Sequence, residues 1–105
     1  MAMDGIELEI LWSNLVSAAS EQGRALQRIA FSPVVREAGD LACALLDREG
    51  RMIAQAVTGT PGHINTLAAA GAHFVEKFPT DSLTEGDILI TNDPWLSAGH
   101  FFDIT

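Results

Sequence analysis

The stretch LACALLDREGRMIAQA, residues 41–56, decides the fold because it contains two short apolar runs joined by a turn. The runs cover 41–46 and 51–56, and Asp47 and Gly50 bound the residues between them. Asp is favoured where a type I turn begins, and Gly tolerates the left-handed conformation that closes one. The stretch therefore predicts a β-hairpin. Cys43 alternates with small apolar residues in the first run, which favours a buried thiol over a nucleophile.

Helical periodicity flanks this hairpin on both sides. Apolar or small residues recur every three to four positions from Leu8 to Ile29, which predicts a helix over 5–30. Asp4 and Glu7 have the spacing of a capping box at its start, and Pro33 follows its end. The same periodicity predicts a second helix over 63–78.

The last quarter of the chain contains a further apolar run at 88–90, bounded by turn residues at 84–87 and 92–94. We predict an α+β fold: a long N-terminal helix, a β-hairpin, a second helix, and a strand at 87–91 that joins a mixed sheet. Residues 101–105 look like the start of another strand. Because so few elements make a thin core, we expect residues 1–105 to be an incomplete piece of a larger domain.

Composition excludes several classes of function. Hydrophobic residues make up 48% of the 105 residues and charged residues 19%, which indicates a globular chain. Six basic against fourteen acidic residues give a net charge of -8, which argues against nucleic-acid and anionic-membrane partners. No transmembrane run or signal peptide is evident, and the single cysteine fits a reducing compartment, so we expect a cytoplasmic protein.

Three stretches in this order and spacing resemble the N-terminal region of the hydantoinase B / 5-oxoprolinase family. The first runs from Ala30 to Asp47 and contains Glu37 and Asp40, the second runs from Gly50 to His63, and the third runs from Gly86 to Ile104. The resemblance implies that residues 1–105 are the N-terminal part of a hydantoinase B/oxoprolinase-like domain. It also implies an ATP-dependent hydrolase that opens hydantoin, N-methylhydantoin or 5-oxoproline rings beside an ATP-binding hydantoinase A-like subunit.

In a related branch of the family, which carboxylates ketones, the equivalent subunit holds a divalent metal, and the resemblance implies one in the complete protein here. Its ligands would be Glu37, His100 and Asp103, with a later His beyond Thr105. Imidazole and carboxylate ligands suit Mn, Zn or Fe. The chain has no GxxxxGK[ST] loop, so ATP is expected on the partner subunit. Because the metal ligands and the ATP site would be incomplete, we expect the isolated 105 residues to be inactive.

The metal candidates each have a structural alternative. His100 and Asp103 point to opposite faces of an extended strand, so they share an ion only if the chain bends near Gly99. Otherwise they are a loop histidine and a capping aspartate. Glu37 is otherwise an exposed carboxylate, and Asp40 competes with it for the same role.

Three further residues are candidates for catalysis: His63, Asn92 and Asp93. His63 lies at the start of the second helix, where it and nearby amides suit a carboxylate or imide oxygen, unless it is a surface histidine. Asn92 both donates and accepts, as recognition of a ring imide requires. Asp93 either takes part in such recognition or caps the loop before Pro94.

Two other functions stay open from the sequence. One is the alpha-type subunit of a metal-dependent ketone carboxylase, the related branch of the same family, with a ketone in place of a small cyclic amide. The other is a non-catalytic assembly module, in which two amphipathic helices complete another subunit's core. In each case we expect an oligomeric, multi-subunit protein.

Overall fold

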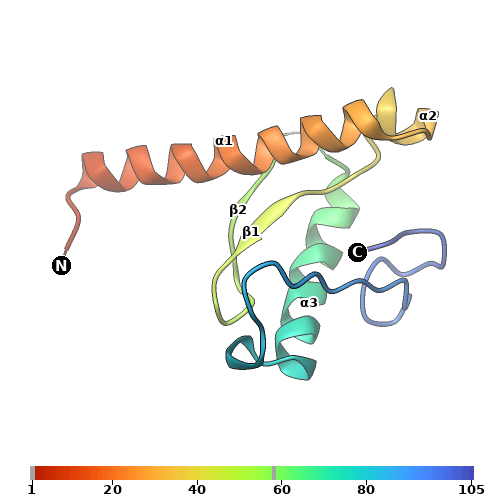
Figure 1. Ribbon diagram of the computed structural model, residues 1–105. Helices are drawn as coiled ribbons and strands as arrows, with labels where there is room; N and C mark the ends of the chain where they lie inside the picture. The colour runs from red at the N-terminus through yellow and green to blue at the C-terminus, as the bar shows by residue number, and fades with distance from the viewer. Residues whose placement is uncertain (1, 58) are drawn as a thin grey trace.

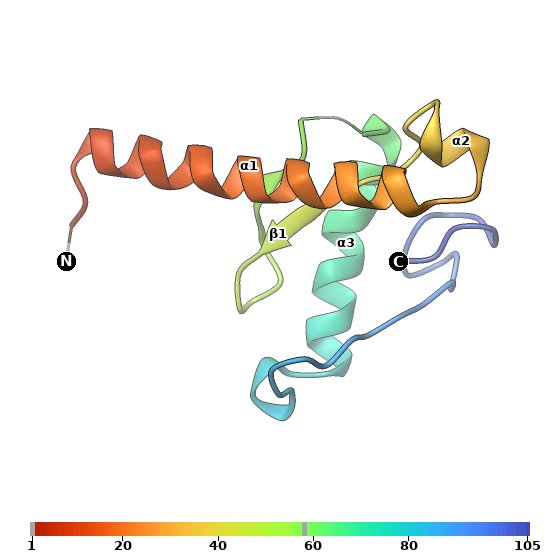
Figure 2. The ribbon, with the colours of Figure 1, turned by 45° about the horizontal axis from the view of Figure 1, so that its top comes forward.

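A computed structural model describes residues 2–57 and 59–105, and it has the predicted α+β architecture. The elements in chain order are α1 (Gly5–Ile29), α2 (Pro33–Arg36), β1 (Ala44–Leu46), β2 (Met52–Gln55), α3 (Pro61–Lys77) and the 3-10 helix Thr80–Ser82. α1 crosses α3 steeply, and the hairpin lies beside both helices (Figure 1). After α3 the chain turns back and runs alongside that helix to the C-terminus (Figures 1 and 2).

Helix α1 begins with the predicted capping box. The Glu7 amide donates to the Asp4 carboxylate at 2.8 Å, and the Asp4 amide donates to the Glu7 carboxylate at 3.1 Å. These bonds satisfy two amides that have no partner within the first helical turn. The helix ends at Ile29, as the position of Pro33 predicts. Its N-terminal half projects beyond the hairpin (Figure 2).

The β-hairpin is confirmed, with β1 and β2 antiparallel and Ala44 opposite Gln55. One carboxylate oxygen of Asp47 accepts the amides of Glu49 and Arg51, at 3.0 and 2.9 Å. The bond from the Arg51 amide, together with the Arg51 side chain, lowers the pKa of Asp47. Gly50 closes the turn at a φ of 79°. The residues predicted to start and end the turn therefore do so.

The hairpin contacts both long helices through small side chains. Its core cluster with α1 consists of Ala19, Leu41, Cys43 and Ala56, all of them buried. On the side of α3, a Cβ atom at Gly50 would lie only 2.9 Å from the carbonyl oxygen of Gly71. Because Gly50 and Gly71 both lack a side chain, the hairpin backbone can approach the α3 backbone closely.

The predicted strand over 87–91 is wrong in the described ranges, where the sheet has two strands. Residues 87–90 have no regular hydrogen-bonded structure, and Ile88 and Ile90 are 87% and 71% exposed. The chain pairs just after this run, where the amides of Thr91 and Thr105 each donate to the other's carbonyl at 2.9 Å. An apolar run forms a strand only beside a neighbour, and the described chain offers none along 87–90.

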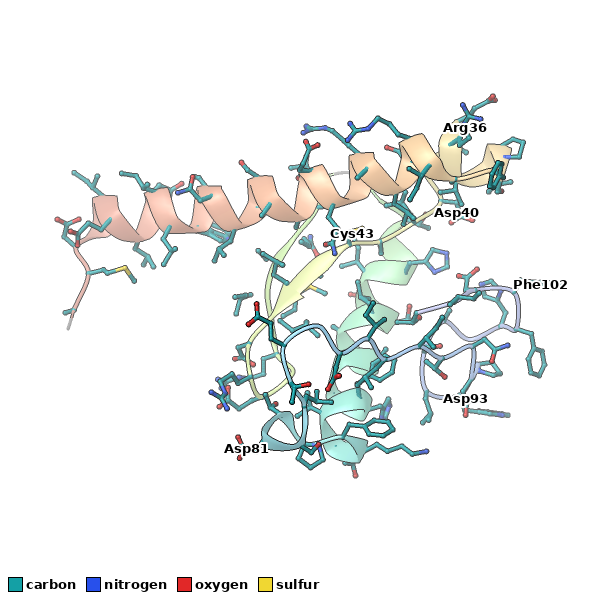
Figure 3. The ribbon with its side chains drawn as sticks, in the orientation of Figure 1. Arg36, Asp40, Cys43, Asp81, Asp93 and Phe102 are labelled. Atoms are coloured by element: carbon teal, nitrogen blue, oxygen red, sulfur yellow. The ribbon has the colours of Figure 1, made fainter. Side chains whose placement is uncertain are left out.

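Large apolar side chains remain on the surface of the C-terminal segment. Phe101, Phe102 and Ile104 are 73%, 93% and 70% exposed, as expected for residues with no place to pack in this chain. Phe102 points outward from the outer edge of its loop (Figure 3). In the described ranges, no helix combines the length and apolar character needed to cross a membrane.

We predict that Gly50→Ala destabilises the fold more than Gly86→Ala does. Both positions have positive φ, 79° and 94°, so both variants carry the backbone cost of a left-handed alanine. Only at Gly50 would the added Cβ meet the Gly71 carbonyl, because at Gly86 nothing lies within 4 Å. We expect an extra loss of about 1–3 kcal/mol in urea unfolding followed by circular dichroism. Equal losses for the two variants would show that the approach of Gly50 to Gly71 does not constrain the fold.

Candidate functional site

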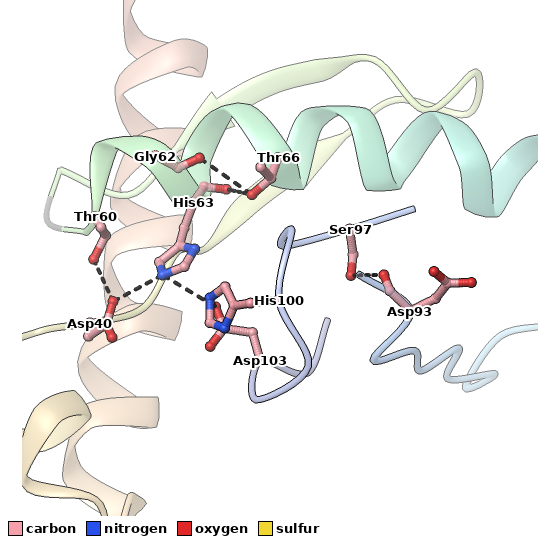
Figure 4. Close-up of polar contacts among 9 residues, drawn as sticks. All are labelled: Asp40, Thr60, Gly62, His63, Thr66, Asp93, Ser97, His100 and Asp103. Atoms are coloured by element: carbon pink, nitrogen blue, oxygen red, sulfur yellow. Dashed lines mark hydrogen bonds and ion pairs between the residues drawn. The ribbon is translucent and has the colours of Figure 1, made fainter. Parts of the chain in front are cut away.

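Three segments that are distant in sequence meet beside the first turn of α3 (Figure 4). His63 lies in that first turn, Asp40 follows α2, and His100 and Asp103 lie in the C-terminal loop. All four side chains carry an imidazole or a carboxylate. The site is therefore formed by the tertiary structure and not by a single contiguous motif.

Thr60 ties the Asp40 segment to the start of α3. Its amide donates to the carbonyl of Leu41 at 3.0 Å, and its hydroxyl donates to the carboxylate of Asp40 at 2.9 Å. The same carboxylate oxygen lies 3.1 Å from Nε2 of His63. Pro61 occupies the first helical turn, where a residue without an amide proton is tolerated. These contacts hold His63 against Asp40.

The bend predicted at Gly99 is present, and it brings His100 and Asp103 together. Gly99 has a φ of 87°, and Nε2 of His100 lies 3.1 Å from Oδ2 of Asp103. The loop that carries them is closed at its base by the reciprocal bonds between Thr91 and Thr105. Residues three apart in sequence thus present their side chains to one another.

The donor atoms of this group have separations that fit a single metal ion. Nε2 of His63 and Nε2 of His100 both lie near Oδ2 of Asp103, at 3.3 and 3.1 Å. One ligand atom from each of the three residues lies within 4.8 Å of the others. Ligands about 2.0–2.2 Å from one zinc ion are themselves roughly 3–3.6 Å apart. Imidazole combined with carboxylate suits Mn, Fe or Zn better than Ca.

A cavity of about 340 Å³ opens next to this group, and Asp40, His63 and Asp103 form part of its wall. The side chain of His63 is 21% exposed and that of Asp103 is 30% exposed. The group is therefore half-buried, but a small molecule in the cavity can reach it. Such a cleft, with a few converging polar groups, is the usual form of a ligand site.

The structure does not bring Glu37 into this group. Glu37 is exposed and caps the short helix α2, where its amide donates to the carbonyl of Pro33. The carboxylate that reaches His63 belongs to Asp40, the competing candidate three residues later. The sequence alone does not show which of Glu37 and Asp40 reaches His63, because the conformation of the turn after α2 determines which side chain points inward. Ligation by Glu37 stays a prediction.

The other catalytic candidates are placed apart from the group. Asn92 is exposed. Asp93 organises a turn: its carboxylate accepts the amide of Trp95, and its carbonyl accepts both the amide and the hydroxyl of Ser97 (Figure 4). This matches the capping alternative for Asp93. A role for either residue in catalysis stays a prediction.

His63 takes part in the group through its imidazole side chain. The sequence also predicts that backbone amides near His63 help to bind an anion, and the structure shows these amides in other hydrogen bonds. The amides of His63 and Ile64 both donate to the carbonyl of Thr60, at 3.0 and 3.2 Å. They are therefore already used within the helix. The sequence signal for the observed role is the run from Thr60 to His63, in which a helix-starting proline places the histidine in the first turn.

Cys43 is buried in the core cluster between α1 and the hairpin, as its sequence position predicts (Figure 3). Burial raises the pKa of the Cys43 thiol, which disfavours the thiolate. The residue is therefore a packing residue of the fold.

Comparison with known proteins gives one family and several relatives. Residues 4–105 match the family described as hydantoinase B/oxoprolinase. The chain is 34% identical over 105 residues to 5-oxoprolinase of Saccharomyces cerevisiae, with 98% of this chain and 8% of that protein covered. It is 27% identical over 104 residues to a putative D-/L-hydantoinase subunit of a Pseudomonas species, with 97% of this chain and 18% of that protein covered.

A plant relative agrees with these two. The chain is 32% identical over 102 residues to 5-oxoprolinase 1 of Arabidopsis thaliana, with 97% of this chain and 8% of that protein covered. The chain thus spans 8% to 18% of the length of these curated relatives. No solved structure matches it significantly.

We predict that Cys43 resists thiol reagents while the protein is folded. Its raised pKa leaves less thiolate at pH 8 than a free thiol has, and its side chain is shielded. Labelling by a disulfide reagent should be about tenfold or more slower than in urea. Because this is the only cysteine of the chain, one equivalent of label in urea reports Cys43 alone. Equal rates in both conditions would contradict a packed thiol.

Proposed function

This chain belongs to the hydantoinase B/oxoprolinase family, and we propose that it forms part of the active site of a hydrolase that opens small cyclic amides. The names of its relatives, hydantoinase and 5-oxoprolinase, support this reaction class. The observation that carries the proposal is the group of His63, His100 and Asp103, in which His63 and Asp103 also line a ligand-sized cavity.

In this proposal the three residues hold a divalent ion through Nε2 of each histidine and Oδ2 of Asp103. Their separations of 3.1 and 3.3 Å support a shared ion, as does the combination of two imidazoles with a carboxylate. Such an ion supplies polarisation of an amide carbonyl or a more acidic water. A further ligand from outside the chain, as the resemblance to the family implies, would complete the site.

Asp40 has a separate task in the proposal. Its carboxylate lines the cavity, and Oδ1 accepts the hydroxyl of Thr60 and lies 3.1 Å from Nε2 of His63. Because Nε2 is also the atom of His63 that would hold the ion, Asp40 bonds this nitrogen in the absence of the ion and is close enough to supply a further carboxylate oxygen to the ion when it is bound. A carboxylate at this wall also accepts the N–H of a ring amide, and so orients the bond to be opened.

We place the ATP-binding function on a partner subunit of the hydantoinase A type. An amide is stabilised by resonance, so opening it requires activation, which ATP can supply. The 105 residues contain no phosphate-binding loop of the GxxxxGK[ST] type, so this ATP is placed on another subunit. The Pseudomonas relative is named as one subunit of a hydantoinase, which supports a multi-subunit assembly for this chain too. The exposed apolar side chains of α1 and of the C-terminal loop supply surface for such contacts.

We predict that His100→Ala and Asp103→Ala each abolish metal retention in the complete protein, while His73→Ala does not. His73 is the matched control because it is exposed on α3, away from the group. Losing a direct ligand should weaken binding by about 100-fold or more, since even outer partners cost roughly 10–100-fold. Elemental analysis of the purified variants, with circular dichroism to establish folding, measures the effect.

A second pair of variants tests whether Asp40 or Glu37 contributes to metal binding. Asp40→Asn should lower metal affinity more than Glu37→Gln, because only Asp40 contacts His63. A folded His100→Ala protein with full metal content would overturn the metal assignment.

The reaction class is tested on the complete protein together with its partner subunit. We expect ATP-dependent opening of hydantoin, N-methylhydantoin or 5-oxoproline, measured by chromatography of the ring-opened product. The isolated 105 residues should be inactive under the same conditions. Carboxylation of a ketone with bicarbonate, without any opening of cyclic amides, would place the protein in the carboxylase branch instead.

A further inference from the structure

Half of the basic side chains of this chain gather in one groove. The chain has six Lys and Arg residues and fourteen Asp and Glu residues. Three of the six, Arg24, Arg28 and Arg36, line a groove of about 440 Å³ together with Gln27. The groove is therefore a positively charged patch on a chain whose net charge is -8.

The groove lies where α1 and α2 meet. Arg24 and Arg28 are one turn apart on α1, so they lie on the same face of that helix. Arg28 is in the last turn of α1, and Arg36 is in the last turn of α2, which contacts α1. Figure 3 shows Arg36 on the side of α2 away from the C-terminal loop. The groove is therefore separate from the candidate metal group on that loop.

A carboxylate of the chain itself already contacts two of these arginines. Oε2 of Glu21 lies 3.6 Å from Nη1 of Arg24, and Oε1 lies 3.2 Å from Nη2 of Arg28. The hydrogen bond from Arg28 and its charge lower the pKa of Glu21. All three side chains are 63% exposed, so these ion pairs are weak, and another carboxylate can replace Glu21. Among the described residues, Arg36 forms no ion pair.

The groove fits a protein segment better than a small anion. Its three arginines are exposed, and among the described residues no apolar side chain lines it. Sites for small ligands are instead enclosed and mostly apolar. Guanidinium groups bind carboxylates through charge-assisted hydrogen bonds, and Arg is enriched at protein interfaces. Carboxylates spaced along one segment can therefore engage arginines of α1 and α2 at the same time.

The character of the groove also favours a separately folded partner. Permanent interfaces resemble a domain core and are mostly apolar, whereas this groove is lined by charged and polar side chains. Of the other three basic residues, Arg48 and Arg51 already form ion pairs with acidic side chains, and Lys77 lies at the end of α3. An acidic partner is thus attracted at this groove and repelled by the many carboxylates elsewhere, which determines its orientation.

We propose that the groove of Arg24, Arg28 and Arg36 docks an acidic segment of the ATP-binding partner subunit. Carboxylates of that segment replace Glu21 beside the two arginines of α1 and bind Arg36 on α2. The groove shares no lining residue with the cavity beside α3, so docking here does not fill that cavity. The inference rests on the proposed function, which places ATP on a partner subunit.

The test measures the affinity of the complete protein for its separately purified partner subunit, by biolayer interferometry at low and high salt. We expect Arg28→Gln/Arg36→Gln to bind about tenfold more weakly at low salt, because charge-assisted contacts are lost. High salt should weaken the unmodified protein and reduce its advantage over the variant. Arg48→Gln/Lys77→Gln is the matched control, because it removes the same charge from other surfaces and should leave the affinity unchanged.

A further variant keeps the test informative if the double variant does not fold. Arg28 and Arg36 lie at helix C-termini, where a cation also stabilises the helix. Arg24 lies earlier in α1 and has no such role. Arg24→Gln should weaken binding of the partner by about threefold, and its circular dichroism spectrum and metal content should be unchanged.

The outcomes separate this inference from the proposed function. Weaker and less salt-sensitive binding by the groove variants, with the control pair unchanged, supports the inference. Equal affinities for the unmodified protein and the groove variants would overturn it and leave the proposed function standing. An equal loss in the control pair would also overturn it, because the attraction would then come from net charge. ATP-dependent ring opening by the complete protein without a partner subunit would overturn the proposed assembly itself.

Discussion

The close contact between the hairpin turn and α3 positions the rest of the molecule. Gly50 and Gly71 allow the two backbones to approach until an added Cβ on Gly50 would lie 2.9 Å from the Gly71 carbonyl. At the start of α3, the Thr60 amide donates to the Leu41 carbonyl, just before β1. Because α3 contacts the hairpin region both at its start and within its length, His63 is held against the Asp40 segment.

The candidate site is built from two parts of the chain. One part is the framework formed by the hairpin region and α3, and the other is the C-terminal loop. Asp40 and His63 belong to the framework, through the bonds of Thr60. His100 and Asp103 belong to a loop that is closed by Thr91 and Thr105 and bent at Gly99. Since the C-terminal loop lacks helices and strands, a bound ion would contribute directly to its stability by linking it to α3.

Much of the surface of this chain is apolar. Apolar side chains are exposed both along the N-terminal half of α1 and on the C-terminal loop, while the buried core consists mostly of small residues. A thin core leaves little free energy to stabilise the chain alone. Exposed apolar surface of this extent is typical of protein contacts, which fits a chain that spans 8% to 18% of the length of its curated relatives.

The sequence by itself determined the local elements of this protein. The capping box at Asp4, the turn from Asp47 to Gly50 and the two helical periodicities depend on neighbouring residues, so local patterns predict them. The resemblance to its family also named His100 and Asp103. Only the tertiary structure decided that Asp40 and His63 stand beside them and that 87–91 forms no strand. Those outcomes depend on which distant segments become neighbours, and no local pattern of residues carries that information.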